Sequence, residues 1–229
     1  MFDWEKNWRG SGIFFVVLFI ICWIIYGSQP GVGASPLDLA SFYDGDRTRI
    51  LIGSTLFAFN LLNLLWFAAA LTSVLRDAGM GGWGNAATIS SAALGAVLFI
   101  IYALNLALAY SISGPGRLEI TSGLNDLTWI LAIVASFPAA MLVMSGSFGL
   151  WRAGIISKGP FLAGVTVMVI LLLRATTWAD SGFWAPDGAY SQYISTAVAL
   201  GWVAVVSGFL YMRSPSTANA PDRVAVPTP

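Results

Sequence analysis

Long uninterrupted apolar runs dominate this chain and limit what it can fold into. Of its 229 residues, 57% are hydrophobic and only 10% are charged, whereas a soluble domain carries roughly a quarter charged residues. Five runs come near the ~20 residues that a helix needs to cross a bilayer, and a sixth run is slightly more polar. The sequence therefore predicts an all-α, polytopic integral membrane helix bundle in the plasma membrane.

Clusters of glycine, proline and charged residues divide the runs into six predicted spans within one domain, residues 1–212. The spans are expected at about 12–27, 49–75, 86–112, 126–151, 160–181 and 191–212. Pro138 should kink the fourth span, because proline lacks the N–H that a helix needs. In the same span, Ser145-Gly-Ser-Phe-Gly149 forms a small-residue face that a second helix can approach closely.

The distribution of lysine and arginine predicts the orientation, since basic residues favour the cytoplasmic side. With a cytoplasmic N-terminus, three basic residues lie outside, namely Arg47, Arg49 and Arg117. The inner segments then hold Lys6, Arg9, Arg76, Arg152, Lys158, Arg213 and Arg223. The opposite topology reverses this ratio, so we expect both termini in the cytoplasm.

The composition excludes several classes of chemistry. There is no histidine, so imidazole ligation of haem or zinc and histidine proton relays are absent. The single cysteine, Cys22, lies in the first span and has no intrachain partner for a disulfide. Lys6 and Lys158 both lie outside the spans, so no lysine is available for a retinal Schiff base. No metal, cofactor or nucleic-acid partner is expected.

Arg174 stands out because it is a charge within an otherwise apolar span, where it needs a partner, a wet cavity or a route to the interface. At 1.5 Å rise per residue, Arg174 and Asn105 each lie roughly 10 Å below the outer ends of their predicted helices. The sequence thus predicts a polar layer in the outer half of the bundle. Its members are Arg174, Asn105, Tyr102 and Asn60, with Asp126 as the preferred acidic partner of Arg174 and Asp180 as the alternative.

Three interpretations of Arg174 remain open. Its side chain can extend outward along Trp178 to the lipid headgroups. It can form a structural ion pair with an aspartate. It can also bind an anionic or amphipathic ligand, as charged residues inside membranes often do.

The first outer loop is a second polar feature. Ser35-Pro-Leu-Asp38 has the pattern of a helix start, with a capping serine and an acid three residues later. The polar run that follows contains Asp44, Asp46, Arg47 and Arg49, too few oxygen ligands for a calcium loop. We expect an aspartate to cap the second span and the arginines to meet lipid headgroups.

The entry to the second span, Phe42-Tyr-Asp-Gly-Asp-Arg-Thr-Arg-Ile-Leu-Ile-Gly53, leads to Trp66-Phe and ends at Leu75-Arg76. Together with the short basic turn at 150–160, it resembles a bacterial membrane family, common in actinobacteria, that is known only as a domain of unknown function. The resemblance covers about residues 12–212 and implies a multi-helix fold, but little about activity. Gly45 within the motif departs from the family pattern, as does Arg174 with its polar neighbours.

Three functions are compatible with these features. The preferred one is a non-catalytic accessory or structural subunit of a membrane assembly, with the bilayer and a protein partner or a second copy as partners. The Pro-rich tail, 213–229, supports it, because the tail cannot order itself without a surface to bind. The alternatives are a small transporter, channel or sensor that binds its ligand near Arg174, and a lipid-modifying enzyme that uses Asp44, Asp46 and Arg47.

Overall fold

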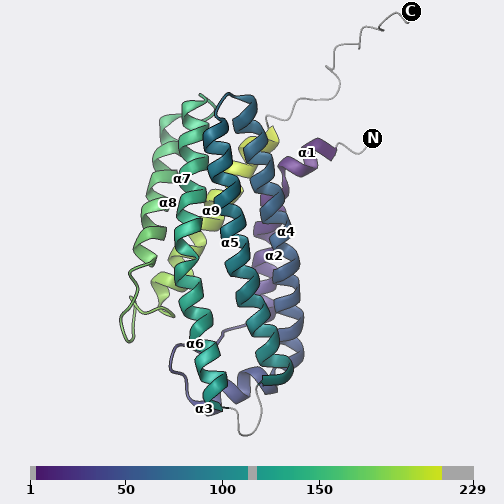
Figure 1. Cartoon of the computed structure of the whole chain (residues 1–229), viewed down its shortest axis with the longest axis vertical. Coiled ribbons are helices and arrows are strands. Elements are labelled where there is room, and N and C mark those ends of the chain that lie inside the picture. Colours follow the sequence, from purple (N-terminus) through teal and green to yellow (C-terminus); the bar gives the residue numbers. More distant parts are fainter. Residues whose placement is uncertain (1–3, 113–117, 213–229) are drawn as a thin grey trace, which may run out of the picture.

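The computed structural model describes residues 4–112 and 118–212, and these residues form a bundle of antiparallel helices (Figure 1). Their order is α1 (Trp4–Arg9), α2 (Ser11–Tyr26), α3 (Pro36–Ala40), η1 (Ser41–Gly45), α4 (Arg47–Asp77), α5 (Gly81–Ala107), η2 (Leu108–Ile112), α6 (Leu118–Val134), α7 (Ser136–Arg152), α8 (Lys158–Arg174), η3 (Tyr190–Ile194) and α9 (Ser195–Met212). The three η elements are single π-helical turns that join or begin longer helices. The predicted all-α class is therefore confirmed for the described residues.

Within the described residues, four helical segments are long and apolar enough to cross a membrane. They are Arg47–Asp77, Gly81–Ser111, Glu119–Arg152 and Tyr190–Met212. α2 and α8 are shorter than these four segments, with 16 and 17 residues. A membrane-embedded helical protein is thus supported by length and composition, whereas the count of six spans stays a prediction.

The fourth predicted span breaks where proline disrupts its hydrogen bonds. Pro138 has no N–H for the carbonyl of Val134, and α6 ends at Val134. The chain resumes as α7 after Ala135, whose own N–H still reaches Leu131 O at 2.8 Å. The predicted interruption is confirmed.

The fifth predicted span is shorter than expected. It was predicted to reach residue 181, but α8 ends at Arg174. The next three N–H groups, from Ala175 to Thr177, donate to carbonyls three residues back, which tightens and ends the helix. The hydroxyl of Thr177 also donates to the carbonyl of Arg174 at 2.7 Å. Arg174 consequently lies at the C-terminal end of its helix, not roughly 10 Å below that end.

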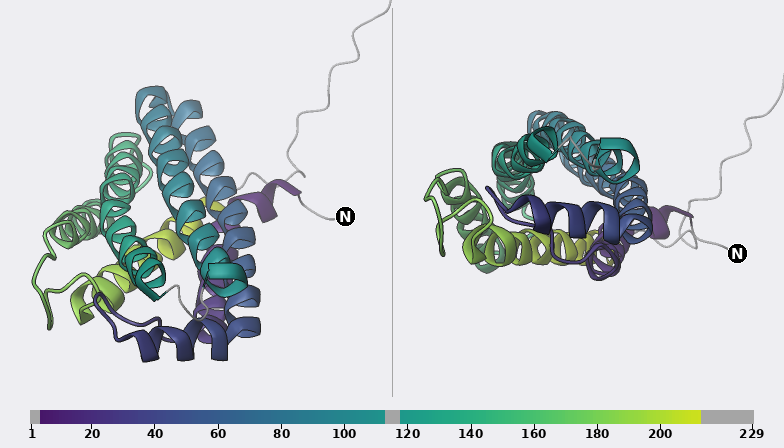
Figure 2. Two further views of the ribbon diagram at one scale, coloured as in Figure 1. Left: turned by 60° about the horizontal axis from the view of Figure 1, so that its bottom comes forward. Right: turned by 90° about the horizontal axis from the view of Figure 1, so that it is seen from below.

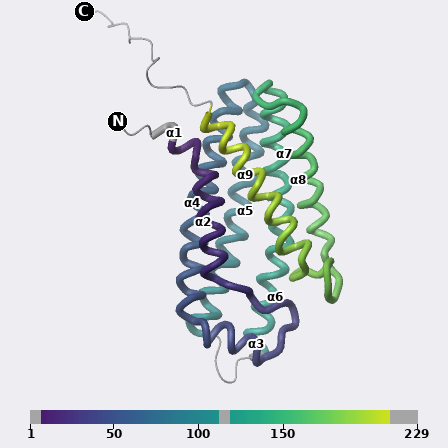
Figure 3. The backbone as a smooth tube through the Cα atoms, turned by 180° about the vertical axis from the view of Figure 1, so that it is seen from behind, coloured from purple at the N-terminus to yellow at the C-terminus, as the bar shows by residue number. Residues whose placement is uncertain are grey.

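α1 and the C-terminal end of α9 lie at the same end of the bundle, the α1 end (Figure 3). There the Ser207 hydroxyl donates to the carbonyl of Arg9 at 2.9 Å. At the opposite end, the α3 end, α3 and η1 lie across the helices (Figure 2). Helix-terminal basic residues Arg76, Arg152 and Lys158 lie at the α1 end, as the sequence grouped them, and Arg47 and Arg49 lie at the α3 end.

Small residues let the helices approach closely around α7. A Cβ atom on Gly146 would lie 2.7 Å from Cζ2 of Trp202, and one on Gly149 would lie 2.8 Å from Cδ2 of Leu75. Neither distance is compatible with a larger side chain unless the neighbour moves. The close approach predicted for the small-residue face is therefore confirmed, and one of its consequences is that Trp202 enters the core.

Candidate ligand-binding cavity

The loop after α2 is fixed to α6 by the amide of Asn125, which is fully buried. Asn125 Nδ2 donates to the carbonyls of Pro30 and Gly31 at 3.2 and 3.0 Å. Its Oδ1 accepts from Tyr43 Oη at 2.9 Å and from Gln29 Nε2 at 3.1 Å. These four bonds use the full hydrogen-bonding capacity of an asparagine amide. Asn125 thus holds in place a loop that forms part of a cavity.

Tyr43 strengthens this anchor from η1. Burial of the ring, together with the negative charge of nearby Asp126, raises the pKa of the Tyr43 hydroxyl above its ordinary value. The hydroxyl, which is protonated at neutral pH even at its ordinary pKa, keeps its proton to still higher pH and donates to Asn125. Sequence analysis missed Asn125, whose only visible signal was an amide next to Asp126 at the start of a span.

Beneath this loop lies a chamber of about 180 Å³, bounded by residues of α2, α4, α5, α6, α8, η3 and α9. Its lining mixes aromatic and polar side chains, and we call it the polar chamber for the polar ones. Tyr26 and Trp129 line it as aromatic walls with one polar atom each. Its other polar side chains include Gln29, Tyr102, Asn105, Arg174, Gln192 and Thr196. Three members of the predicted polar layer, Arg174, Asn105 and Tyr102, therefore meet at one cavity.

Arg174 is half-buried and faces this cavity. Its Nε donates to Ser191 Oγ at 3.1 Å, which is the one hydrogen bond of its guanidinium group within the described part of the chain. Both terminal Nη groups are left for another acceptor. A guanidinium has five donors in a planar fork that matches a carboxylate or phosphate, so a bound anion would complete its coordination.

The predicted acidic partners of Arg174 lie elsewhere. Asp126 Oδ1 instead accepts from the backbone N–H of Gly33 at 3.0 Å, and Asp180 is exposed. Among the described residues no carboxylate pairs with Arg174, so the expected ion pair does not form. The Arg174 side chain also does not extend outward along Trp178. Trp178 is 56% exposed, whereas Arg174 lines the apolar chamber.

Asn105 provides an unusual second polar group in the chamber. The residue is 2% exposed, and its Oδ1 is buried without a hydrogen-bond partner in the described structure. An unpaired buried acceptor costs about 1–3 kcal/mol. Rotation of the amide by half a turn would exchange Oδ1 for Nδ2, so Asn105 can accept from a hydroxyl or donate to an anion.

Asn60 does not belong to this cavity. Its Nδ2 donates to the carbonyl of Phe15 at 2.9 Å, and its Oδ1 accepts from Asn63 at 3.2 Å. It therefore ties α4 to α2, as buried amides often do between membrane helices. Asn60 thus lies outside the group of predicted residues that line the cavity.

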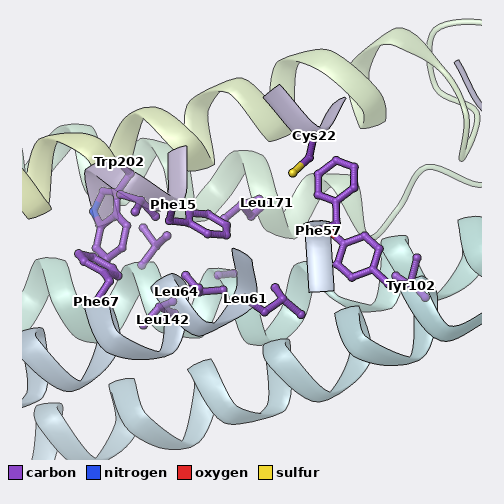
Figure 4. Packing of buried hydrophobic residues seen from close by; sticks show 14 of the residues in the cluster. Phe15, Cys22, Phe57, Leu61, Leu64, Phe67, Tyr102, Leu142, Leu171 and Trp202 are labelled. Atoms are coloured by element: carbon purple, nitrogen blue, oxygen red, sulfur yellow. The ribbon is translucent and has the colours of Figure 1, made fainter. Parts of the chain in front are cut away.

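A second chamber, of about 250 Å³, adjoins the polar one and is almost entirely apolar. Phe19, Ile101, Tyr102, Arg174 and Thr196 line both chambers, so Arg174 stands at their boundary. A row of buried side chains runs along this part of the core, from Trp202 and Phe67 past Phe15 to Phe57 and Tyr102 (Figure 4). The two chambers together form an amphipathic cavity.

The outer loop residues are engaged in structural contacts. Ser35 caps α3 as predicted, with its Oγ accepting from the N–H of Asp38 at 3.2 Å. Asp46 precedes α4 but makes no side-chain cap bond, contrary to expectation, because its carboxylate pairs with Arg49.

Arg47 Nη2 donates to the carbonyl of Tyr110 at 2.9 Å, and its guanidinium lies 5.4 Å from the centre of that ring. Asp44 is exposed. Within the described ranges, no group of three or more Cys, Asp or Glu side chains is arranged to hold a metal ion.

Searches against protein-family models, curated proteins and solved structures found no match to this chain. The resemblance to the bacterial membrane family therefore stays a prediction.

Proposed function

We propose that this protein binds an anionic amphiphile between its membrane helices. The anionic group is held by Arg174 at the boundary of the two chambers, and the hydrocarbon part occupies the apolar chamber. The observation that carries the proposal is the position of Arg174, which lines both chambers and whose terminal nitrogens have no partner among the described residues. Binding of this kind suits a carrier or a membrane sensor.

Physical chemistry supports an anion at this place. A charge buried without a counter-charge is costly, and removal of one partner from a buried pair destabilises a protein strongly. The guanidinium here is half-buried and has no carboxylate partner among the described residues, so part of that cost remains. A carboxylate or phosphate that accepts from both Nη groups would restore the pair in a medium of low dielectric constant, where charge-assisted hydrogen bonds are strong.

The apolar chamber supplies the rest of the affinity. Each methylene group transferred from water contributes about 0.8 kcal/mol. The walls around Leu171 and Leu200 offer no hydrogen bonds to a polar ligand, so this space suits hydrocarbon. A small inorganic anion would leave it empty.

We further propose that all six long segments cross the plasma membrane, with the α1 end in the cytoplasm. The grouping of Arg76, Arg152 and Lys158 at that end supports this orientation. α8 spans only about 25 Å, but helices shorter than the bilayer core are accommodated by local thinning. The cavity then lies in the outer half of the membrane.

Binding of radiolabelled dodecanoate to purified, detergent-solubilised protein tests the proposed function. Saturable binding is expected, and Arg174→Gln should weaken it about ten-fold or more, the effect of losing a hydrogen-bonded charge. Arg152→Gln is the matched control, since Arg152 is an exposed residue at the far end of α7. Equal affinity of the wild type and Arg174→Gln would contradict the proposal.

A further inference from the structure

A groove of about 270 Å³ lies between α8 and α9. Its walls are almost wholly apolar and include Pro160, Ala163 and Val167 from α8. From α9 they include Val198 and Val205. Ala163 and Val205 are exposed, so the groove opens on the outside of the bundle.

Trp202 lies between this groove and the interior, because its side chain lines both the groove and the apolar chamber. A single hydrogen bond, from Nε1 to Ser147 Oγ at 3.0 Å, fixes the indole. Phe67 contacts its ring edge-on, with centroids 6.0 Å apart. The indole has room for this position because Gly164 has no side chain. A Cβ atom on Gly164 would clash with Ser147 and lie 3.3 Å from the indole nitrogen.

We infer that the ligand is a membrane amphiphile whose hydrocarbon chain passes between the bilayer and the cavity through the α8–α9 groove, past Trp202. This inference rests on the function proposed above. The groove and the chamber share one lining residue, Trp202, and both are lined mostly by hydrocarbon. Lipid chains cover any apolar outer groove of a membrane-spanning protein, so the occupant of the groove follows from its surroundings.

The size of the apolar chamber supports this route. Arg174 stands at the boundary of the two chambers, so with an acidic group held there only the apolar chamber, about 250 Å³, is left for the hydrocarbon part. A long chain whose acidic end is held at Arg174 therefore needs more room than the chamber offers. The groove beyond Trp202 continues the space in apolar surroundings. A short soluble anion needs neither the chamber nor the groove.

A photoreactive hexadecanoic acid with a diazirine near its methyl end tests the route. The protein is reconstituted in phosphatidylcholine vesicles, mixed briefly with the probe, illuminated and mapped by mass spectrometry. In the wild type we expect adducts on groove residues such as Val198 and on chamber residues such as Leu200. Excess butanoate, a short soluble carboxylate, should not displace the chamber adducts.

Substitutions at two glycines of α9 give a matched pair. A Cβ atom at Gly201 or at Gly208 meets open space, but only Gly201 lines the groove. Gly201→Leu should reduce chamber adducts about five-fold or more at short mixing times, whereas Gly208→Leu should leave them unchanged. Ala163→Leu, on the opposite wall, should act like Gly201→Leu.

The outcomes separate the route from the binding function. Chamber adducts that vanish in Arg174→Gln but persist in Gly201→Leu and Ala163→Leu would overturn the route and leave the binding function intact. Displacement by butanoate as effective as that by unlabelled hexadecanoate would show a soluble anion as the ligand. Chamber adducts unaffected by Arg174→Gln would contradict the binding function, and the route with it.

Discussion

At the scale of single residues, two buried asparagines near the α3 end of the bundle have opposite roles. Asn125 has every donor and acceptor position occupied, whereas Asn105 keeps a buried oxygen without a partner in the described structure. A satisfied amide stabilises the fold, whereas an unsatisfied one beside a cavity can bond to a ligand once its amide group turns toward the cavity. Asn125 therefore supports the loop above the cavity, whereas Asn105 belongs to the candidate binding site.

Asn125→Ala tests the supporting role. It removes four hydrogen bonds and leaves the carbonyl of Gly31 without its side-chain donor, whereas the carbonyl of Pro30 still accepts from Trp129 Nε1, so we expect a loss of about 2–3 kcal/mol in the free energy of unfolding. Thermal unfolding in detergent measures the change. Asn63→Ala is the control, because Asn63 donates one bond at 3.2 Å and should lose less than about 1 kcal/mol. Equal losses in the two variants would show that Asn125 does not anchor the loop.

At the scale of helices, the sequence predicted what depends on local chemistry. The break near Pro138 and the cap at Ser35 follow from the residues themselves and are confirmed. The end of α8 was predicted too late because the apolar run continues past Arg174. The helix ends where the hydroxyls of Thr176 and Thr177 donate to backbone carbonyls, and hydropathy does not report such bonds. Periodicity therefore located the helices better than it located their ends.

The cavity was predictable only in part. Arg174, Asn105 and Tyr102 were grouped by residue type and approximate position along their helices, and all three line one cavity, although Arg174 lies at the end of α8 and not below it as the depth estimate assumed. The position of Asn60 outside the cavity and the missed Asn125 have the same cause: both bond to backbone carbonyls of segments distant in the sequence, Asn60 to Phe15 and Asn125 to Pro30 and Gly31. Such partners leave no pattern in the chain.

At the scale of the whole molecule, the remaining question is how the bundle lies in the membrane. The predicted accessory-subunit role depended on the tail 213–229, which lies outside the described residues, and it stays a prediction. The orientation depends on the basic helix ends, which the structure gathers at the α1 end. It can be measured without knowledge of the ligand.

Single cysteines at exposed positions report the orientation. Cysteine at Asp44, at the α3 end, should react with an impermeant thiol reagent added to intact cells. Cysteine at Asp77, at the α1 end, should react only after the cells are opened. The native Cys22 is buried and gives little background. Labelling of the Asp77 variant in intact cells would reverse the assigned topology.

The central claim is that Arg174 recognises the charge of an amphiphile, and a comparison of dodecanoate with dodecan-1-ol tests it most directly. The two ligands share the hydrocarbon chain and differ in the anionic group, so the ratio of their dissociation constants isolates the contribution of charge. We predict that the wild type binds the acid about ten-fold or more tightly than the alcohol, and that Arg174→Gln binds both alike. Arg174→Lys should retain part of the preference, since it keeps the charge without the planar fork. An undiminished preference for the acid in Arg174→Gln would contradict the account.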